Sequence, residues 1–173
     1  IEYLNINNMK RMILIVATLL LGLTLSAQSG KEIYEKYSSN EGATCVYVSP
    51  AMFDMIKTMD LNSLVQATGE PAMAEILPLV KRLEGMYVVQ LEGPNNAMKA
   101  DVKKLVDAKK YEVLIQVKES GQEVNIYIYK VQDIIKSIVL LVQEDNGSVF
   151  IAIDGTIQQQ ELNELVNSLP KYL

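Results

Sequence analysis

The residues of this sequence that could take part in catalysis are almost all carboxylates. The chain has 21 Asp and Glu residues, one Cys and no His. Without His, neither a Ser-His-Asp triad nor a Cys-His pair can be built from these residues, and a zinc site of His and Cys is excluded. A Ser-Lys dyad would have to use Ser120 or Ser137 as the nucleophile. It would also need a buried lysine as the base, and nothing in the sequence indicates one. We therefore predict no catalytic residue, no cofactor and no metal site.

A pair of carboxylates could still act together in hydrolysis. Glycoside hydrolases need two such groups facing each other across a cleft, about 5–10 Å apart. The candidates are Glu84, Glu92, Glu112, Glu144 and Asp154. They lie on predicted strands or at strand ends and do not cluster, so we interpret them as solvated strand ends and turn residues. A carboxylate-dependent hydrolase remains an alternative function.

Tyrosines are the more informative group, with nine in the chain against two Phe and no Trp. Tyr127 and Tyr129 alternate with Ile126 and Ile128, so the tyrosines occupy one face of their strand and the isoleucines the other.

Polar residues nearby indicate which of the two faces is open. Glu123 and Asn125 fall on the tyrosine face, which favours this face as the wetter, open one. Because Tyr combines a large contact area with a polar tip, it suits a binding surface. The predicted binding residues are Tyr87, Tyr111, Tyr127 and Tyr129, with Tyr47 as a further candidate. The alternative is cross-strand packing that stiffens the sheet.

Residues of high β-propensity predict the strands that position these side chains. The predicted strands cover residues 44–48, 85–91, 111–118, 123–131, 134–143 and 149–154. The last four are separated only by short turns at Ser120-Gly121, Gln132-Asp133 and Asn146-Gly147. The Asn-Gly pair favours a type I′ turn, with positive φ at both residues. Three tight links in a row predict an antiparallel meander.

Apolar residues at helical spacing predict the helices. One is expected over 31–37. Others begin at Ser49-Pro50, near Glu70-Pro71, at Asn95 or Asn96, and at Thr156, where Thr156 and Gln159 would form a capping box. Their predicted inward residues are Met52, Met55, Ile56 and Met59; Met73, Ile76, Leu77 and Val80; Met98, Val102, Leu105 and Val106; and Leu162, Leu165, Val166 and Leu169.

This order of elements predicts an α+β fold. Its sheet would be mainly antiparallel, with about six strands, and the helices would pack on one face to give a two-layer sandwich. The C-terminal part would be the four-strand meander followed by a helix.

The N-terminal residues predict export. Met9 reads as the translation start, so residues 1–8 are interpreted as an upstream, non-native segment. Two basic residues, an apolar run over 13–25 and a small-residue site predict a signal peptide over 9–27, followed by a single domain over 28–173. The run is shorter than the roughly 20 apolar residues that cross a bilayer. We expect no stable membrane span after cleavage, and a periplasmic or envelope-associated protein.

Charge and cysteine content limit the partners further. Residues 28–173 carry 14 basic and 20 acidic side chains, a formal charge of −6. Because an acidic domain repels phosphate backbones, we expect no nucleic-acid partner. Cys45 is the only cysteine, so no internal disulfide can form, and we interpret it as a small core residue.

Several short stretches, taken in order, resemble a known family. They are the signal peptide ending at Ala27-Gln28, then residues 33–38 (IYEKYS), 46–49 (VYVS), 111–112 (YE), 117–118 (VK), 140–142 (LLV) and 151–155 (IAIDG). Together they are similar to the domain-of-unknown-function family numbered four-two-five-two, which comprises small exported bacterial envelope proteins. The resemblance implies an envelope protein without assigned activity and supplies no catalytic residues.

Three functions stay open at this point. The leading hypothesis is a non-enzymatic envelope domain that binds another protein or envelope component through an open sheet face or an edge strand. The first alternative is a small-ligand carrier with a pocket between the helices and the sheet. The second is the carboxylate-dependent hydrolase.

Overall fold

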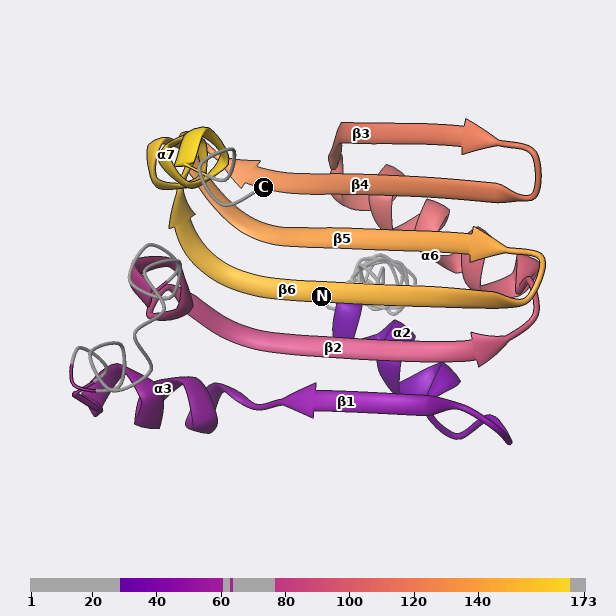
Figure 1. Cartoon of the computed structure of the whole chain (residues 1–173), viewed down its shortest axis with the longest axis horizontal. Helices are drawn as coiled ribbons and strands as arrows, with labels where there is room; N and C mark the ends of the chain where they lie inside the picture. Colours follow the sequence, from indigo (N-terminus) through magenta and orange to yellow (C-terminus); the bar gives the residue numbers. More distant parts are fainter. Residues whose placement is uncertain (1–28, 61–62, 64–76, 169–173) are drawn as a thin grey trace, which may run out of the picture.

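Six antiparallel strands form the framework of the protein. The computed structural model describes residues 29–60, 63 and 77–168, with side chains up to residue 163. The strand order is β1-β2-β6-β5-β4-β3, and every neighbouring pair is antiparallel (Figure 1). The strands are β1 (Thr44–Val48), β2 (Leu83–Glu92), β3 (Glu112–Glu119), β4 (Gln122–Val131), β5 (Ile134–Glu144) and β6 (Gly147–Gln158). The predicted α+β fold and its C-terminal meander are confirmed.

The three turns of the meander differ in backbone conformation. Gly121 (φ 80°) and Gln132 (φ 58°) take the positive φ that reverses the chain between β3 and β4 and between β4 and β5. The third turn uses Asp145 and Asn146, since Gly147 already pairs with Glu144 in the ladder. Neither Asn146 nor Gly147 has a positive φ, so the predicted type I′ conformation is wrong at this turn.

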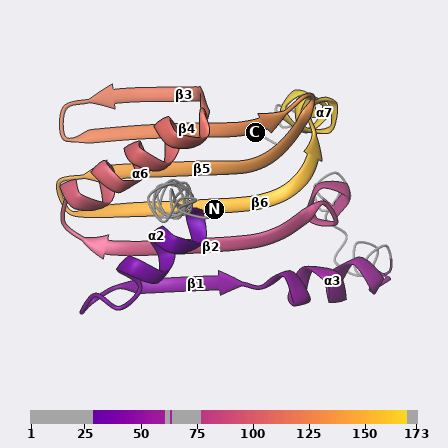
Figure 2. The same ribbon diagram turned by 180° about the vertical axis from the view of Figure 1, so that it is seen from behind.

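Two helices cover one face of the sheet (Figure 2). They are α2 (Gly30–Tyr37) and α6 (Asn96–Lys109). Ser29 begins α2 with a capping box to Glu32, and Asn95 begins α6 by accepting a hydrogen bond from the backbone N–H of Met98 at 2.8 Å. Both helices begin where the sequence offers a capping side chain. That side chain satisfies a backbone N–H group that has no partner within the helix.

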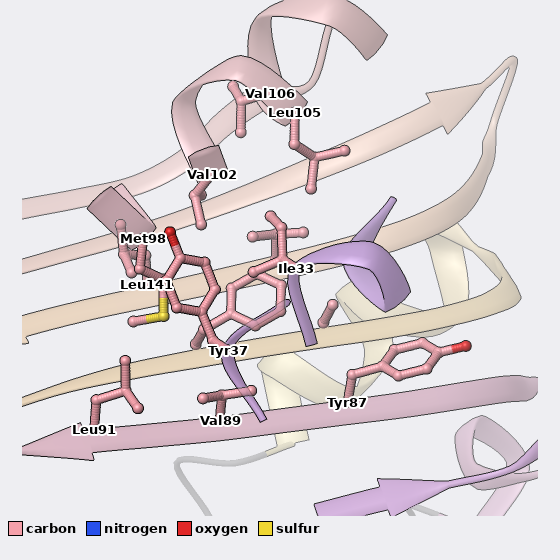
Figure 3. Close-up of a cluster of buried hydrophobic side chains, with 13 residues drawn as sticks. Ile33, Tyr37, Tyr87, Val89, Leu91, Met98, Val102, Leu105, Val106 and Leu141 are labelled. Carbon is pink, nitrogen blue, oxygen red and sulfur yellow. The ribbon is translucent and has the colours of Figure 1, made fainter. Parts of the chain in front are cut away.

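The main core lies between these helices and the sheet (Figure 3). Its fully buried members include Ile33 of α2, Leu105 of α6 and Phe150 of β6. The predicted inward face of α6 is confirmed, since Met98, Val102, Leu105 and Val106 are all buried. Burying large aliphatic side chains stabilises the fold by roughly 1.5–3 kcal/mol each.

A buried carboxylate ties α2 to α6. Asp101 of α6 is 5% exposed. It accepts hydrogen bonds from Lys36, from the Tyr37 hydroxyl at 2.8 Å and from Lys104 at 3.3 Å. Burial raises the pKa of Asp101, but these three donors together outweigh it and hold that pKa below its usual value. All the carboxylate's partners come from the two helices, so we interpret it as a structural link.

Helix α3 (Pro50–Thr58) follows β1 along the chain (Figure 1). It does not bury the predicted face. Ser49 caps it as expected, but Phe53 is its one buried residue, whereas Met52, Met55 and Met59 are 43%, 54% and 52% exposed. The prediction of an inward methionine stripe is therefore wrong. The larger aromatic ring takes the core position, one residue after Met52, and turns the methionines outward.

Helix α7 (Gln159–Ser168) starts later than predicted. Thr156 lies within β6, and its backbone N–H donates to the carbonyl of Arg82 at 2.9 Å. Ile157 pairs with Ile135, which extends the strand to Gln158. The predicted capping box at Thr156 is wrong, because the local cap signal loses to pairing with β2 and β5.

Some predictions lie outside the described residues. They concern residues 1–28, most of the helix expected near 70–80, and the inward side chains Leu165, Val166 and Leu169.

Candidate functional site

The predicted binding tyrosines lie on the face that the helices cover. Tyr47, Tyr87 and Tyr127 belong to one cross-strand row, linked through Ala152 and Val139. Tyr87 is 6% exposed and belongs to the core, and Tyr127 packs against that core. The prediction that the tyrosine face is the open one is therefore wrong.

Hydrogen bonding explains why polar residues mark the covered face. Asn125 is 1% exposed, donates to Glu123 at 3.0 Å and accepts from Gln116 at 2.8 Å. Lys99 of α6 donates to the other oxygen of Glu123, and the hydrogen bonds from Lys99 and Asn125 hold the pKa of Glu123 below its usual value. Buried polar groups are tolerated where each one has a partner, so polarity did not mean exposure here.

Ring contacts join five tyrosines into two separate groups. Tyr47 stacks on Tyr87 with ring centroids 5.3 Å apart, and Tyr34 of α2 lies 5.9 Å from each of them. Tyr111 lies 5.6 Å from Tyr129 near the far edge of the sheet. Tyr47 keeps 45% of its surface exposed. The five predicted residues therefore do not make one continuous aromatic platform.

A pocket of about 320 Å³ lies between α6 and the strands β3 and β4, and we name it the α6 pocket. Its apolar lining includes Val106, Val113 and Leu141, and its polar lining includes Lys99 and Tyr127. Burial raises the pKa of Tyr127, so its phenol stays protonated at neutral pH. The pocket combines four apolar side chains with seven polar or charged ones, so a ligand that fits it would itself need both apolar and polar parts.

Asp154 is the acid with the most unusual surroundings. Burial raises its pKa, the Ser137 hydroxyl and the charge of Lys109 lower it in part, and the charge of Glu84 raises it further. Ser137 is close enough to influence both Asp154 and Tyr111, but its buried Oγ reaches hydrogen-bond geometry with neither. The carboxylate thus lies on the covered face, where burial outweighs the neighbouring groups that favour its charge.

Three of the other predicted acids have ordinary partners. Glu84 accepts from Thr156 at 2.6 Å, Glu112 pairs with Lys130 at 2.9 Å, and Glu144 accepts from Gln122 at 2.7 Å. These contacts favour the interpretation of solvated strand ends over a catalytic pair.

The open face of the sheet is aliphatic, and it faces the viewer in Figure 1. Its central row crosses all six strands in register. The row consists of Val46, Val88, Ile151, Leu140, Ile126 and Ile115. Two flanking rows add Val48, Met86, Ile153 and Ile138 on one side and Val149, Val142, Val124 and Val117 on the other. We name these fourteen residues the aliphatic face.

These side chains are half-buried or exposed, in contrast to their neighbours on the covered face. The outermost, Val46, Ile115 and Val117, are 44–46% exposed. Along β5 the two faces alternate strictly, with Val139 and Leu141 buried and Ile138, Leu140 and Val142 half-buried. Contiguous apolar surface of this kind marks interaction sites in soluble proteins.

Charged residues border the two ends of the aliphatic face, and Glu112 occupies the β3 position of the flanking row that contains Ile138. Glu92, Glu119 and Glu144 follow the last apolar row at one end, and we name them the acidic rim. At the other end, α7 packs Leu162 onto a smaller cluster that contains Ile128. Arg82 pairs there with Glu161 of α7 at 2.9 Å.

Sequence reasoning missed the aliphatic face, although a signal was present. Residues 138–142 of β5 (IVLLV) and 149–153 of β6 (VFIAI) are apolar on both faces. Such runs are typical of strands that are covered on both sides. With the helices on one face only, they predict a second apolar surface that needs a partner.

Other kinds of site find no support in the part of the chain that the structure describes. No group of three or more His, Cys, Asp and Glu residues there could hold a metal ion. Cys45 is a free, half-buried thiol that packs against the core. Among the same residues, no helix has the length and hydropathy needed to cross a bilayer.

Comparison with known proteins gives one match. The model of the family described as Domain of unknown function (DUF4252) matches residues 37–165. No curated protein and no solved structure matches the chain.

Proposed function

Because the chain belongs to the family described as Domain of unknown function (DUF4252), which carries no assigned activity, we propose a function from its surface. The protein is a non-enzymatic binding domain, and it contacts another polypeptide through the aliphatic face. We also propose that it acts in the cell envelope, on the basis of the predicted signal peptide over residues 9–27. The observation that carries the binding role is the uncharged row that runs from Val46 to Ile115 across all six strands.

The size of this surface supports the proposal. Six strands spaced about 4.8 Å apart make a width of about 29 Å, and three rows about 6.8 Å apart make a length of about 20 Å. This rectangle holds six positions in each of three rows, and fourteen of them belong to the aliphatic face, so the projected area of that face is about 460 Å². That value lies within the range of the largest patches found on monomeric proteins, about 300–600 Å². Leaving that much apolar surface in water would be unfavourable by about 25 cal/mol per Å².

Charge favours a polypeptide over an anionic lipid surface. The acidic rim borders the aliphatic face, and residues 28–173 carry a formal charge of −6. Negative lipid head groups attract basic segments and repel acidic ones. A flat sheet face of Val, Ile and Leu instead suits another apolar protein surface, packed at about 10 Å.

Site-specific photocross-linking tests this role. In the test variant a photoreactive amino acid replaces Leu140, at the centre of the aliphatic face. In the control variant the same amino acid replaces Met55 of α3, which is apolar and 54% exposed but lies off that face. Irradiation in the native envelope should give a discrete protein adduct from position 140 and none of the same mass from position 55.

A third protein controls for non-specific capture. It combines the probe at position 140 with Val88→Lys, two strands away in the same row. The lysine should abolish the adduct, because an unpaired charge opposes apolar packing. An adduct that persists with Val88→Lys, or no adduct from position 140, refutes binding through this face.

A second candidate function is a small-ligand carrier, and the α6 pocket favours it. Its volume of about 320 Å³ lies at the lower end of the range for ligand sites, about 300–1,000 Å³. Native mass spectrometry of the purified protein should then show a bound small molecule. Val106→Phe, which fills the pocket from α6, should remove it, whereas Met55→Phe should not. A wild-type protein with no added mass, or one that keeps its ligand after Val106→Phe, contradicts the carrier role.

A further inference from the structure

We infer that the polypeptide covering the aliphatic face is a second copy of this chain, so that two sheets pack face to face in a two-fold dimer. The inference rests on the proposed binding role of that face. It adds the identity of the partner and the geometry of the complex.

The first argument is the shape and chemistry of the face itself. Its fourteen residues are Val, Ile, Leu and Met, with no aromatic ring and no charge, and they stand in three rows that are in register across the strands. Sheets that pack face to face bring such rows together so that the side chains interdigitate in a layer about 10 Å thick. A surface of this kind is complementary to itself, which is what a two-fold interface requires.

The second argument is area. The three rows, with their four remaining residues Thr44, Gln90, Glu112 and Ile128, cover about 590 Å² of projected surface per copy, which becomes about 1,200 Å² when two copies meet. A specific interface needs to bury about 1,000 Å² in total, and obligate homodimers have more apolar interfaces than other complexes. The three rows taken whole therefore meet the lower limit for a stable homodimer.

The third argument concerns α7 and fixes the orientation. This helix lies on the side of the aliphatic face (Figure 1), since Leu162 packs against the cluster that contains Ile128, which is in register with Ile138. A helix is about 10–12 Å across, close to the separation of two packed sheets of about 10 Å. Two α7 helices at the same end would collide. A two-fold axis running across the strands instead places each α7 beyond the acidic rim of the other copy.

Charge agrees with the same orientation. In that arrangement the acidic rims of the two copies lie at opposite ends of the dimer, and each faces an end where Arg82 and Lys130 are already paired with Glu161 and Glu112. With the opposite orientation, the two acidic rims would face each other. Keeping the two acidic rims apart favours the proposed alignment, because like charges brought together across an interface are unfavourable.

The fourth argument is the composition of the central strands. β5 and β6 are apolar on both faces, but α2 and α6 cover only one. A second sheet supplies the missing layer and turns the half-buried residues into a core like that of a β-sandwich.

Sedimentation equilibrium of the protein purified after expression of the full chain tests the inference. The wild type should have twice the monomer mass at micromolar concentration. Leu140→Lys should weaken the dimer at least about a hundredfold, because the two-fold axis brings the lysines of both copies together in an apolar layer. Met55→Lys is the matched control, since it adds the same charge to a more exposed apolar position off the face, and it should remain dimeric.

Folding is checked separately by far-UV circular dichroism and thermal unfolding. Leu140 is half-buried in a single chain, so the monomeric variant should keep its secondary structure. If it unfolds, Ile115→Lys on the outermost strand replaces it, because Ile115 is 46% exposed. A monomeric wild type at 100 μM (about a hundred times the working concentration), or a folded variant that stays dimeric, overturns the inference.

Failure of the inference can be told from failure of the proposed function. If the photocross-linked adduct at position 140 has the mass of two chains, both stand. If it contains one other protein and the purified chain is monomeric, the face binds a partner but not a second copy. If no adduct forms and the chain is monomeric, both fail.

Discussion

Gly30→Ala tests whether α2 packs on the sheet as described. The assignment of the covered and open faces depends on this packing. Gly30 is buried at the start of α2, against β6. A Cβ at position 30 would lie 2.4 Å from the Cβ of Ala152. Because non-bonded carbons prefer a separation of about 3.5–4.0 Å, the helix must move away from β6 by more than about 1 Å.

The size of the effect follows from two opposing contributions. Forcing an extra methyl group into a packed core costs about 1–3 kcal/mol. Replacing Gly by Ala restricts the unfolded chain and returns about 0.4–1 kcal/mol. We expect a net loss of about 1–2 kcal/mol in the free energy of unfolding.

A compensating change makes the test specific. In Gly30→Ala/Ala152→Gly the second substitution removes the methyl group that causes the clash. The double variant should therefore be more stable than the sum of the two single changes, with a coupling of about 1 kcal/mol, as for residues in direct contact. Gly147→Ala is the control, because its nearest neighbour, the Leu91 carbonyl, is 3.4 Å away.

Urea unfolding followed by circular dichroism supplies these free energies. If Gly30→Ala is as stable as Gly147→Ala, or if Ala152→Gly does not rescue it, α2 does not pack on β6 as described. The tyrosine face would then be open, and the proposed function would have to move to it.

Three further predictions concern the core and two buried acids. Phe150→Ala removes a fully buried ring and should lower the unfolding free energy by about 3–5 kcal/mol in the same urea assay; a loss under about 1 kcal/mol would contradict the core assignment. The pKa of Asp101 is lowered in the folded state, so the stability that Asp101 contributes is present above its unfolded pKa of 3.8 and is lost as pH falls through the folded pKa. In stability–pH profiles, Asp101→Asn should therefore be less stable than wild type near pH 7. The difference in unfolding free energy between the two proteins should narrow in acid. The pKa of Asp154 is raised in the folded state, so the folded protein loses stability as pH rises from the unfolded pKa of 3.8 through the folded pKa. Asp154→Asn should therefore be more stable than wild type at pH 7. Equal or lower stability of the variant would show that folding does not disfavour the charged carboxylate.

The sequence predicted the elements well where the local signal and the tertiary contacts agree. The strand over 44–48 and the start of α6 at Asn95 are examples. Both depend on features within a few residues, namely β-branched runs and capping side chains.

Local signals failed where a distant contact competed with them. Thr156 has the form of a helix cap, but its backbone N–H is bound by the carbonyl of Arg82, more than seventy residues earlier. In α3 the spacing of the methionines matches a buried face, but Phe53 takes the core position. Periodicity indicates that a helix has an apolar side; it does not indicate which side meets the sheet.

The position of the candidate site was also beyond what local sequence signals indicate. Alternation in β4 established from the sequence alone that Tyr127 and Ile126 lie on opposite faces, because the side-chain period of a strand is two. Which of those faces is open depends on where α2 and α6 pack, and they cover the tyrosines, with Glu123 and Asn125 satisfied beneath α6. Composition, charge, the strands and the absence of His are thus properties of the sequence. The exposure of the aliphatic face is a property of the tertiary structure, because a helix can bury polar residues that it hydrogen-bonds and leave apolar ones for another partner.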